Sequence, residues 1–226
     1  MMALPSGYKR LEYIQSSGTQ YINTGFKPNQ NTKVSAVFQG NKTSDATVFG
    51  CDAGWGSNGF SVFANAAQFG SKTTSGLTFY GDTQISVIFD KGTLYKNDTQ
   101  VWNTSGLFSS QNEMTLFANN RNGSAQEFMT GKIYSCQIYD NGSLVRDYIP
   151  AKLDDGTVGL YDRLNGLLYI NAGTGTFEAG PSSLNLPVNI GGTWKDANEA
   201  FANIGGTWKT VKAAYVNING TWKELS

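Results

Sequence analysis

The sequence contains no histidine, and this absence restricts its chemistry more than any other feature of its composition. Without an imidazole the chain cannot form a Ser-His-Asp or Cys-His nucleophilic system, and it cannot hold zinc or iron through histidine. Catalysis would have to use carboxylate, lysine or tyrosine groups. We therefore expect a protein that is not an enzyme, with no catalytic residue, no cofactor and no bound metal ion.

Charge is also scarce. The 17 Lys and Arg residues balance 17 Asp and Glu residues, and only 15% of the chain is charged. Such a chain gains little from releasing counterions, so nucleic acid is not an expected partner. No run approaches the roughly 20 apolar residues that a membrane helix needs, and residues 1–10 lack the pattern of a secretory signal. We expect a soluble product that is made in the cytoplasm or is a mature form, with no membrane insertion.

Cysteine is nearly absent, since only Cys51 and Cys136 occur. Two cysteines cannot form the disulfide framework of a small secreted domain. One disulfide bond or two buried thiols both remain compatible with the sequence.

What the sequence has in abundance are glycines, 27 of them, and aromatic residues, 13% of the chain. Short runs with alternating apolar residues recur as far as about residue 180, separated by Gly, Asn, Asp and Ser, which indicates many short strands joined by polar turns. Expected strands are Lys33–Phe38, Gly59–Phe63, Gln84–Phe89, Glu113–Phe117 and Lys132–Tyr139. Expected turns are Asp90–Gly92, Asp140–Gly142, Asp154–Gly156 and Leu164–Gly166. The fold class is therefore all-β.

A threefold repeat follows a polar linker at residues 181–187. Asn-Ile-(Gly/Asn)-Gly-Thr-Trp-Lys recurs at residues 189–195, 203–209 and 217–223. Each copy predicts a β-hairpin with a two-residue turn, and each Trp is expected to face the Ile of the incoming strand. A lone hairpin is marginal in water, so these hairpins, within residues 188–226, should stack or attach elsewhere. The residues expected to carry attachment or oligomerisation are Ile190, Trp194, Ile204, Trp208, Ile218 and Trp222.

Several segments of the body carry a resemblance: Leu4–Gly25, Gly131–Tyr139, Leu144–Ala151, Gly159–Asp162 and Gly173–Pro181. They resemble the first and closing strands of laminin-G-like, concanavalin A-like domains found in bacteriophage virion proteins and gut-bacterial proteins. The resemblance implies a jelly-roll β-sandwich over residues 1–180, followed by the three hairpin repeats. The repeats are similar to short repeats in structural proteins of phages that infect Gram-positive hosts.

Most members of this family are binding or adhesion modules, and a minority are glycoside hydrolases. The hydrolases carry Glu-x-Asp-x-Glu on one strand, because a retaining mechanism needs two carboxylates roughly 5 to 5.5 Å apart. This sequence lacks that triplet, and Asp154-Asp155-Gly156 is better interpreted as a turn. Some laminin-G domains bind calcium, and Asp45 and Asp52 are conceivable ligands, although the sequence alone does not assemble an oxygen shell.

Sugar binding would use aromatic faces together with side chains that form hydrogen bonds to hydroxyl groups. Candidates are Trp55 in a Gly-rich loop with Asp52 and Asn58, the polar cluster with Asn119 and Arg121, and Tyr80 and Trp102 at strand ends. The alternative is that the tryptophans cap the core and that the Asn-rich segment is a solvated turn. Both interpretations stay open at this point.

These observations lead to an expected function. The protein is expected to be a non-enzymatic structural protein of a phage particle, either a head decoration, a head fibre or a tail-associated adhesin. Its partners would be other virion proteins, its own copies in a homotrimer or another closed ring, and host surface polysaccharide. Its location would be the virion after synthesis in the host bacterial cytoplasm. The alternatives are a bacterial carbohydrate-binding module or surface adhesin and, less favoured, a glycoside hydrolase.

Overall fold

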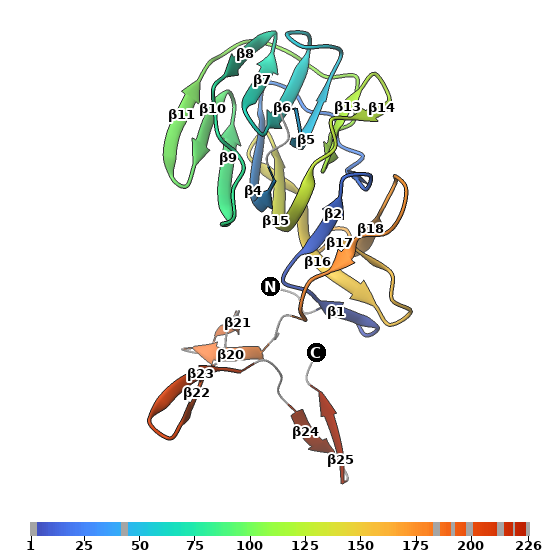
Figure 1. The fold of residues 1–226 in the computed structure, drawn as a ribbon, viewed down its shortest axis with the longest axis vertical. Coiled ribbons are helices and arrows are strands. Elements are labelled where there is room, and N and C mark those ends of the chain that lie inside the picture. Colours follow the sequence, from blue (N-terminus) through green and yellow to red (C-terminus); the bar gives the residue numbers. More distant parts are fainter. Residues whose placement is uncertain are drawn as a thin grey trace.

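The computed structural model describes residues 4–41, 45–182, 186–190, 193–197, 201–211, 215–218 and 220–224. All regular elements in these ranges are β-strands, which confirms the all-β class (Figure 1). No helix that could cross a membrane occurs in the described part of the chain. Most of the strands form two sheets in the body, and the remaining six form three separate pairs after residue 185.

The larger sheet has 11 strands in the described body, with the order β11-β10-β9-β4-β15-β16-β17-β18 and with β1, β2 and β19 paired beside it. Its central pairings are antiparallel, and β4 and β15 are joined over most of their lengths. The strands are β1 (Tyr8–Arg10), β2 (Ile14–Ser17), β4 (Thr32–Gly40), β9 (Ile85–Asp90), β10 (Thr93–Lys96), β11 (Thr99–Asn103), β15 (Thr130–Asp140), β16 (Ser143–Leu153), β17 (Val158–Asp162), β18 (Leu167–Ile170) and β19 (Glu178–Ala179).

Among the described residues the smaller sheet has 8 strands, with the order β14-β13-β5-β6-β7-β8 and with β12 bridging β5 and β3. Its pairing is antiparallel except between β13 and β5, which run parallel. The strands are β3 (Ile22–Asn23), β5 (Thr47–Asp52), β6 (Gly59–Phe63), β7 (Ala66–Gly70), β8 (Lys72–Ser75), β12 (Thr115–Leu116), β13 (Asn119–Arg121) and β14 (Ser124–Gln126).

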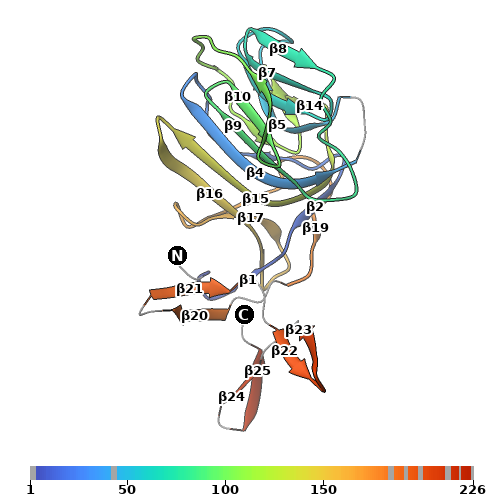
Figure 2. The same ribbon diagram turned by 90° about the vertical axis from the view of Figure 1, so that its left-hand side faces the viewer.

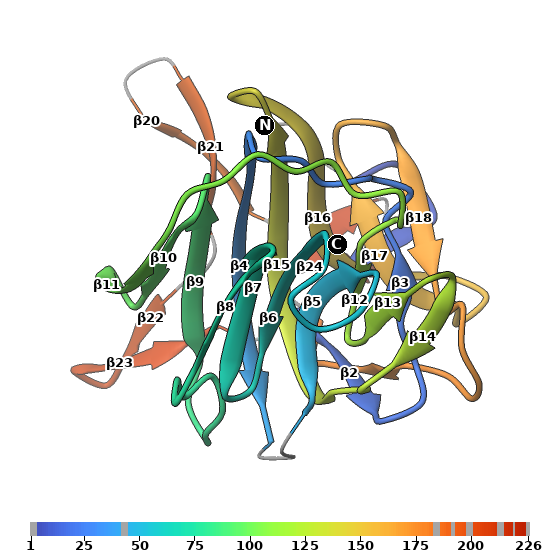
Figure 3. The same ribbon diagram turned by 90° about the horizontal axis from the view of Figure 1, so that it is seen from above.

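The two sheets stack face to face, with β5 to β8 lying over β9, β4 and β15 (Figure 3). Alternate residues of β4 and β9 are buried, as expected for strands with one face on a core. Phe60 lies at the centre of this core, where its ring is 4.6 Å from that of Phe89 and 6.2 Å from those of Phe49 and Phe69, measured between centroids. The core therefore lies between the sheets, as in a β-sandwich.

Three strands of the smaller sheet differ from the expected pattern of one buried face. Every residue of β5, β6 and β7 is buried. One face packs on the core. The segment after β5 lies over part of the other face, where Gln68 Nε2 donates a hydrogen bond to the Gly54 carbonyl oxygen at 3.4 Å and the ring of Trp55 contacts that of Phe63. Polar side chains are enclosed on this outer face, and the candidate site is built on them.

All four expected turns are formed. Lys91 and Gly92 join β9 to β10 with φ of 50° and 95°, and Asn141 and Gly142 join β15 to β16 with φ of 49° and 84°. Two positive φ values are what a two-residue hairpin turn requires. The strand expected over Glu113–Phe117 is shorter than predicted, since Phe117 adopts a φ of 67° and the strand ends before it.

The C-terminal repeats form antiparallel pairs: β20 (Leu186–Ile190) with β21 (Thr193–Ala197), β22 (Phe201–Ile204) with β23 (Thr207–Thr210), and β24 (Tyr215–Ile218) with β25 (Thr221–Glu224). In the second pair Gly205 and Gly206 form the turn with φ of 61° and 82°. Each pair is a separate two-stranded sheet. Stacking of the repeats on one another therefore stays a prediction.

The register of these pairs corrects one expectation. Each Trp lies opposite Asn and each Ile opposite Thr, as in Asn203 with Trp208 and Ile204 with Thr207. The two-residue turn fixes this register, because the residues that flank it must face each other. The predicted Trp–Ile pairs are therefore wrong. Of the six residues expected to carry attachment, Ile204 is 59% exposed. The side chains of the other five lie outside the described part of the chain: Ile190, Trp194, Trp208, Ile218 and Trp222.

The body chain ends beside its own beginning. Leu11 forms a β-bridge with Ser182, and the Glu12 backbone N–H donates to the Pro181 carbonyl oxygen at 2.9 Å. This exit lies at the end of the body that carries β1, whereas β5, β7 and β8 lie at the opposite end (Figures 1 and 2).

Candidate functional site

Asp52 anchors the candidate site from beneath. It is the last residue of β5 and is fully buried. Its Oδ1 accepts hydrogen bonds from the Gly54 backbone N–H at 2.9 Å and Arg121 Nε at 2.8 Å, and its Oδ2 accepts from Asn119 Nδ2 at 2.7 Å and Arg121 Nη2 at 3.1 Å. Four bonds, two of them in a bidentate contact with arginine, compensate the burial of a carboxylate.

The parallel pairing of β13 with β5 brings these groups together. The register places Arg121 beside Asp52 and Asn119 beside Gly50. Gly50 is required there, because a Cβ atom would clash with Ser61 Oγ and would lie 3.0 Å from Asn119 Oδ1. Ser61 Oγ instead donates a hydrogen bond to Asn119 Oδ1 at 3.2 Å. The missing side chain at position 50 thus makes room for a buried polar layer.

Glu127 extends this layer toward the surface. Its Oε1 accepts from Arg121 Nη2 at 3.2 Å and its Oε2 accepts from Asn119 Nδ2 at 3.1 Å. The side chains of Arg121 and Glu127 are 28% and 22% exposed, so both reach solvent while Asp52 does not. The network therefore runs from a buried carboxylate to a partly exposed ion pair.

Trp55 lies in the segment after β5. Gly54 and Gly56 flank it with φ of 130° and 75°, values that residues with a side chain rarely adopt. The segment closes on itself through a hydrogen bond from the Ala53 N–H to the Ser57 carbonyl oxygen at 3.0 Å. Trp55 is 53% exposed, and its ring meets that of Phe63 edge to face at 5.6 Å between centroids. A turn with an internal hydrogen bond thus holds an aromatic surface in solvent.

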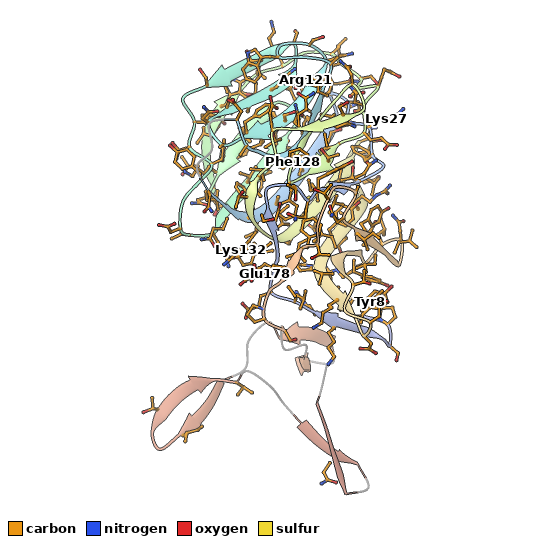
Figure 4. All side chains as sticks on the ribbon, turned by 45° about the vertical axis from the view of Figure 1, so that its right-hand side comes forward. Tyr8, Lys27, Arg121, Phe128, Lys132 and Glu178 are labelled. Carbon is orange, nitrogen blue, oxygen red and sulfur yellow. The ribbon has the colours of Figure 1, made fainter. Side chains whose placement is uncertain are left out.

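The residues around Trp55 and Arg121 line a pocket of about 400 Å³ that is open to solvent on the outer side of the smaller sheet. Arg121 marks its position on the body, far from the repeats (Figure 4). Two aromatic rings and several polar and charged side chains line it: Asp45, Trp55, Phe63, Asn65, Ala66, Ser75, Arg121 and Glu127. A pocket with an apolar wall and a few convergent polar groups is the usual form of a small-ligand site.

The electrostatics of the pocket follow from the burial of its ion pairs. Burial raises the pKa of Glu127, and the charges of Asp52 and Asp45 act in the same direction, whereas Arg121 and Asn119 oppose it. The hydrogen bonds to Asp52 are the main cause of a raised pKa of Arg121. Arg121 therefore stays charged, and its charge is directed at two carboxylates of the protein.

The structure brings together four of the seven candidate glycan-binding residues. Trp55 and Arg121 line the pocket, while Asp52 and Asn119 lie beneath it, fully buried. Buried side chains cannot touch a ligand, so the expected direct contacts of Asp52 and Asn119 with a sugar are not possible. These two residues instead support the side chains above them. Asn119 and Arg121 also belong to strand β13, whereas Asn122 and Gly123 form an exposed turn after it, so the alternative of a solvated turn is wrong only for the first part of the Asn-rich segment.

The other three candidates do not line this pocket. Asn58 Nδ2 donates to the Ser109 carbonyl oxygen at 3.3 Å. Trp102, on β11 at the far edge of the larger sheet, packs against the core with its ring 6.0 Å from Phe89. Tyr80 is half-buried against the same core. Trp102 thus fits the core-capping alternative, whereas the exposed Trp55 does not.

Sequence reasoning missed the pocket residues Phe63, Asn65, Ala66, Ser75 and Glu127, and it named Asp45 only as a conceivable calcium ligand. Glu127 follows β14, with a φ of 54°, and no local pattern marks it. It reaches the pocket because β13 adds to β5 in parallel, and such a pairing between distant segments leaves no periodic signal in either one.

The two cysteines are free and buried, Cys51 on the smaller sheet and Cys136 on the larger. Burial raises the pKa of each thiol to about 12. The alternative of a disulfide is therefore excluded in this structure, and neither thiol is activated for chemistry.

Asp154-Asp155-Gly156 is the expected turn: Asp155 Oδ1 accepts from the Thr157 backbone N–H at 2.8 Å, and this bond is the main cause of a lowered pKa of Asp155. Among the described residues, no group of three or more His, Cys, Asp or Glu side chains is arranged to hold a metal ion. Asp52, considered above as a calcium ligand, already accepts four hydrogen bonds from the protein.

Comparison with known proteins found no family model, no curated protein and no solved structure that matches this chain. What is established is therefore an all-β protein with two stacked sheets in its body. The resemblance to laminin-G-like domains stays a prediction.

Proposed function

We propose that this protein is a non-enzymatic binding protein whose body binds carbohydrate in the Trp55 pocket. The observation that carries the proposal is the exposed ring of Trp55 beside partly exposed Arg121 and Glu127 in one pocket. The C–H face of a sugar ring packs on an aromatic face, and its hydroxyl groups form hydrogen bonds with charged and amide groups around that face. Asn65 and Ser75 provide further neutral partners on the rim.

The buried network supports binding by keeping the pocket in one arrangement. Asp52 fixes both the Arg121 guanidinium and, through the Gly54 N–H, the turn that presents Trp55. A site that is ordered before the ligand arrives loses less conformational entropy when it binds. The weak affinity of a single shallow sugar site is raised when several copies act together.

The proposed setting is a bacteriophage particle, and it rests on the sequence resemblance and on the repeats. The chain leaves the body beside Leu11, at the end opposite the strands that carry the pocket. Repeats attached to the particle or to sister subunits, in a trimer or another closed ring, would leave the pocket facing outward. A bacterial carbohydrate-binding module or adhesin would use the same pocket in another setting.

The glycosidase alternative has one observation in its favour. Asp45 and Glu127 both line the pocket, and Glu127 has a raised pKa, as the acid of a glycosidase does. A hydrolase would release reducing sugar from a polysaccharide that the pocket binds, and Glu127→Gln would abolish that release. We expect no release from either form, and release by the wild type would replace binding with hydrolysis as the function.

The proposal is tested on a glycan array, followed by calorimetry with the sugars that bind. Trp55→Ala should weaken binding at least about tenfold, because it removes the aromatic platform and leaves the buried network in place. Leu107→Ala is the matched control, since Leu107 is 91% exposed and does not line the pocket. Binding that Trp55→Ala leaves unchanged would reject the pocket, and the absence of any glycan binding would reject the function.

A further inference from the structure

An exposed apolar patch lies at one edge of the body. The part of the chain that the structure describes has six exposed large apolar side chains, and three of them belong to the hairpin formed by β17 and β18: Leu164, Leu167 and Ile170. These three are 50%, 58% and 54% exposed. Single exposed apolar residues are common on proteins, whereas a cluster of them indicates a surface that another protein segment covers.

The patch coincides with the edge of a sheet. Among the described strands β18 pairs only with β17, and it ends the larger sheet on the side opposite β11 (Figure 3). The other outer strands carry mostly polar residues: β11 is Thr-Gln-Val-Trp-Asn, β8 is Lys-Thr-Thr-Ser and β14 is Ser-Ala-Gln. The sequence of β18 is Leu-Leu-Tyr-Ile, so it lacks the charged residues that usually keep a further strand away from an edge.

The available edge is short and well defined. Directly after β18 the chain is bound to another segment, because Asn171 Oδ1 accepts from the Tyr21 N–H at 3.1 Å and the Ala172 N–H donates to the Tyr21 carbonyl oxygen at 2.9 Å. Leu167 and Ile170 are three residues apart and therefore lie on opposite faces of the sheet. A strand added beside β18 would thus meet an exposed apolar side chain on either face.

The second repeat has a strand that matches this edge. β22 is Phe-Ala-Asn-Ile, which is four residues long like β18 and contains no charge. In the described structure β22 pairs only with β23, and Ile204 at its end is 59% exposed. An isolated hairpin is marginal in water, and a neighbouring sheet provides the third strand and the apolar contact that make it stable.

The path of the chain indicates which copy supplies the hairpin. Ser182 bridges Leu11, the Leu11 N–H donates to the Pro150 carbonyl oxygen, Pro150 lies opposite Leu160, and Leu160 lies opposite Tyr169 of β18. A strand added to β18 would therefore lie about 24 Å from Ser182, because adjacent strands are about 4.8 Å apart. Residues 183–185 span at most about 14 Å before β20 begins, so the first hairpin cannot reach this edge of its own body. Such short connectors keep the repeats near the exit of their own chain and favour a second copy as the source.

We propose that the edge of β18 binds the second hairpin of a neighbouring copy. β22 adds to β18 as a further strand, and Ile204 packs on the exposed residues of the edge. The two contacting surfaces differ, so the contact is heterologous and successive copies close into a ring. This inference rests on the part of the proposed function in which the repeats join sister subunits, and it does not depend on sugar binding.

The first test replaces Leu167 and Ile170 by lysine, singly and together, in the full-length protein. Analytical ultracentrifugation measures the dissociation constant of the assembly, which each single lysine should raise at least about tenfold because a charge at the edge opposes strand addition. The double variant should be monomeric, and its thermal unfolding shows whether the fold is kept. A double variant that assembles like the wild type, or a wild type that is monomeric, would overturn the inference.

Leu107→Lys is the matched control. Leu107 is 91% exposed and follows β11, at the opposite side of the larger sheet. This variant should assemble as the wild type does. An equal loss of assembly would overturn the inference in favour of nonspecific apolar association.

A second test identifies the occupant of the edge. A Leu167→Cys protein is mixed with an Ile204→Cys protein under mild oxidation, and the native Cys51 and Cys136 do not compete because both are buried. We expect disulfide-linked heterodimers. Homodimers of Leu167→Cys alone would overturn the hairpin in favour of two paired edges, and no cross-link at all would overturn the second hairpin as the occupant. A cross-link that forms only within a chain carrying both substitutions would place the hairpin on its own body and overturn the ring.

Glycan binding separates this inference from the proposed function. The monomeric double lysine variant should keep the single-site, Trp55-dependent affinity, because the pocket lies on the smaller sheet. Assembly that depends on β18 without glycan binding by any form would overturn sugar binding alone. Glycan binding together with assembly that does not depend on β18 would overturn this inference alone.

Discussion

Asp52 contacts both the charged side chain of the pocket, Arg121, and the turn that carries Trp55. Its carboxylate is fully buried, yet it determines the position of the Arg121 guanidinium and of the turn that carries Trp55. The neighbouring glycines are part of the same arrangement, since a side chain at Gly59 would clash with Gln68 and would lie 2.9 Å from the Asp52 Cβ atom. The surface of the site thus depends on residues that a ligand cannot reach.

Replacement of Asp52 by Ala is expected to lower the free energy of unfolding by about 1–3 kcal/mol, because Arg121 and Asn119 lose one of their two carboxylate partners and keep only Glu127. Urea unfolding followed by tryptophan fluorescence measures the change. The exposed Asp82 provides the control, and Asp82→Ala should unfold as the wild type does. A loss below about 1 kcal/mol, the size typical of a surface ion pair, would show that the network carries little stability.

At the scale of elements, the decisive feature is the addition of β13 to β5. These strands are separated by more than sixty residues and run parallel, which aligns Arg121 with Asp52 on one face. The opposite face of β5 and β6 packs on the core through Phe49 and Phe60. The strands that pack on the core therefore also position the pocket residues, so a change in the core of the sandwich would alter the geometry of the pocket.

Substitution of Phe60 tests how much the core beneath β5 and β6 contributes to stability. Phe60→Ala should lower the free energy of unfolding by about 3–5 kcal/mol, because it leaves a cavity among Phe49, Phe69, Phe89 and Phe108. Chemical denaturation provides the measurement. Leu107→Ala serves again as the control, and its stability should be unchanged because Leu107 is almost fully exposed. A small effect of Phe60→Ala would mean that the core collapses around the deletion.

At the scale of the whole molecule, body and repeats are separate in their strand pairing. The three repeat pairs form their own two-stranded sheets, and the described strands of the body are complete without them. A two-stranded hairpin alone is at most marginally stable, so the repeats need a further surface. We expect that surface on other copies or other proteins of an assembly.

Deletion of residues 186–226 should therefore leave a folded, monomeric body with unchanged glycan affinity for a single site. Size-exclusion chromatography with light scattering measures the mass, and the thermal midpoint of the body reports its fold. The full-length protein is the control and should be oligomeric. A truncated body that remains oligomeric would place the assembly surface on the sandwich, and a truncated body that unfolds would show that the repeats complete its core.

The sequence by itself determined the all-β class, the expected turns of the body and the hairpin form of the three repeats, since alternation of apolar residues, Asn-Gly and Lys-Gly turns and repeated motifs are local signals. The predicted linker at residues 181–187 is shorter in the structure, because Pro181 and Ser182 pair with the body and Leu186 already begins β20. It also marked Trp55, because a Trp within a Gly-rich segment has no periodic place in a core. Only the tertiary structure decided that Asp52 and Asn119 are buried, that Trp102 belongs to the core and that Glu127 joins the pocket. These outcomes depend on which distant strands pair and in which register. Strand pairing and register are set by the burial of whole sheets, and the sequence of a short segment contains no signal for either.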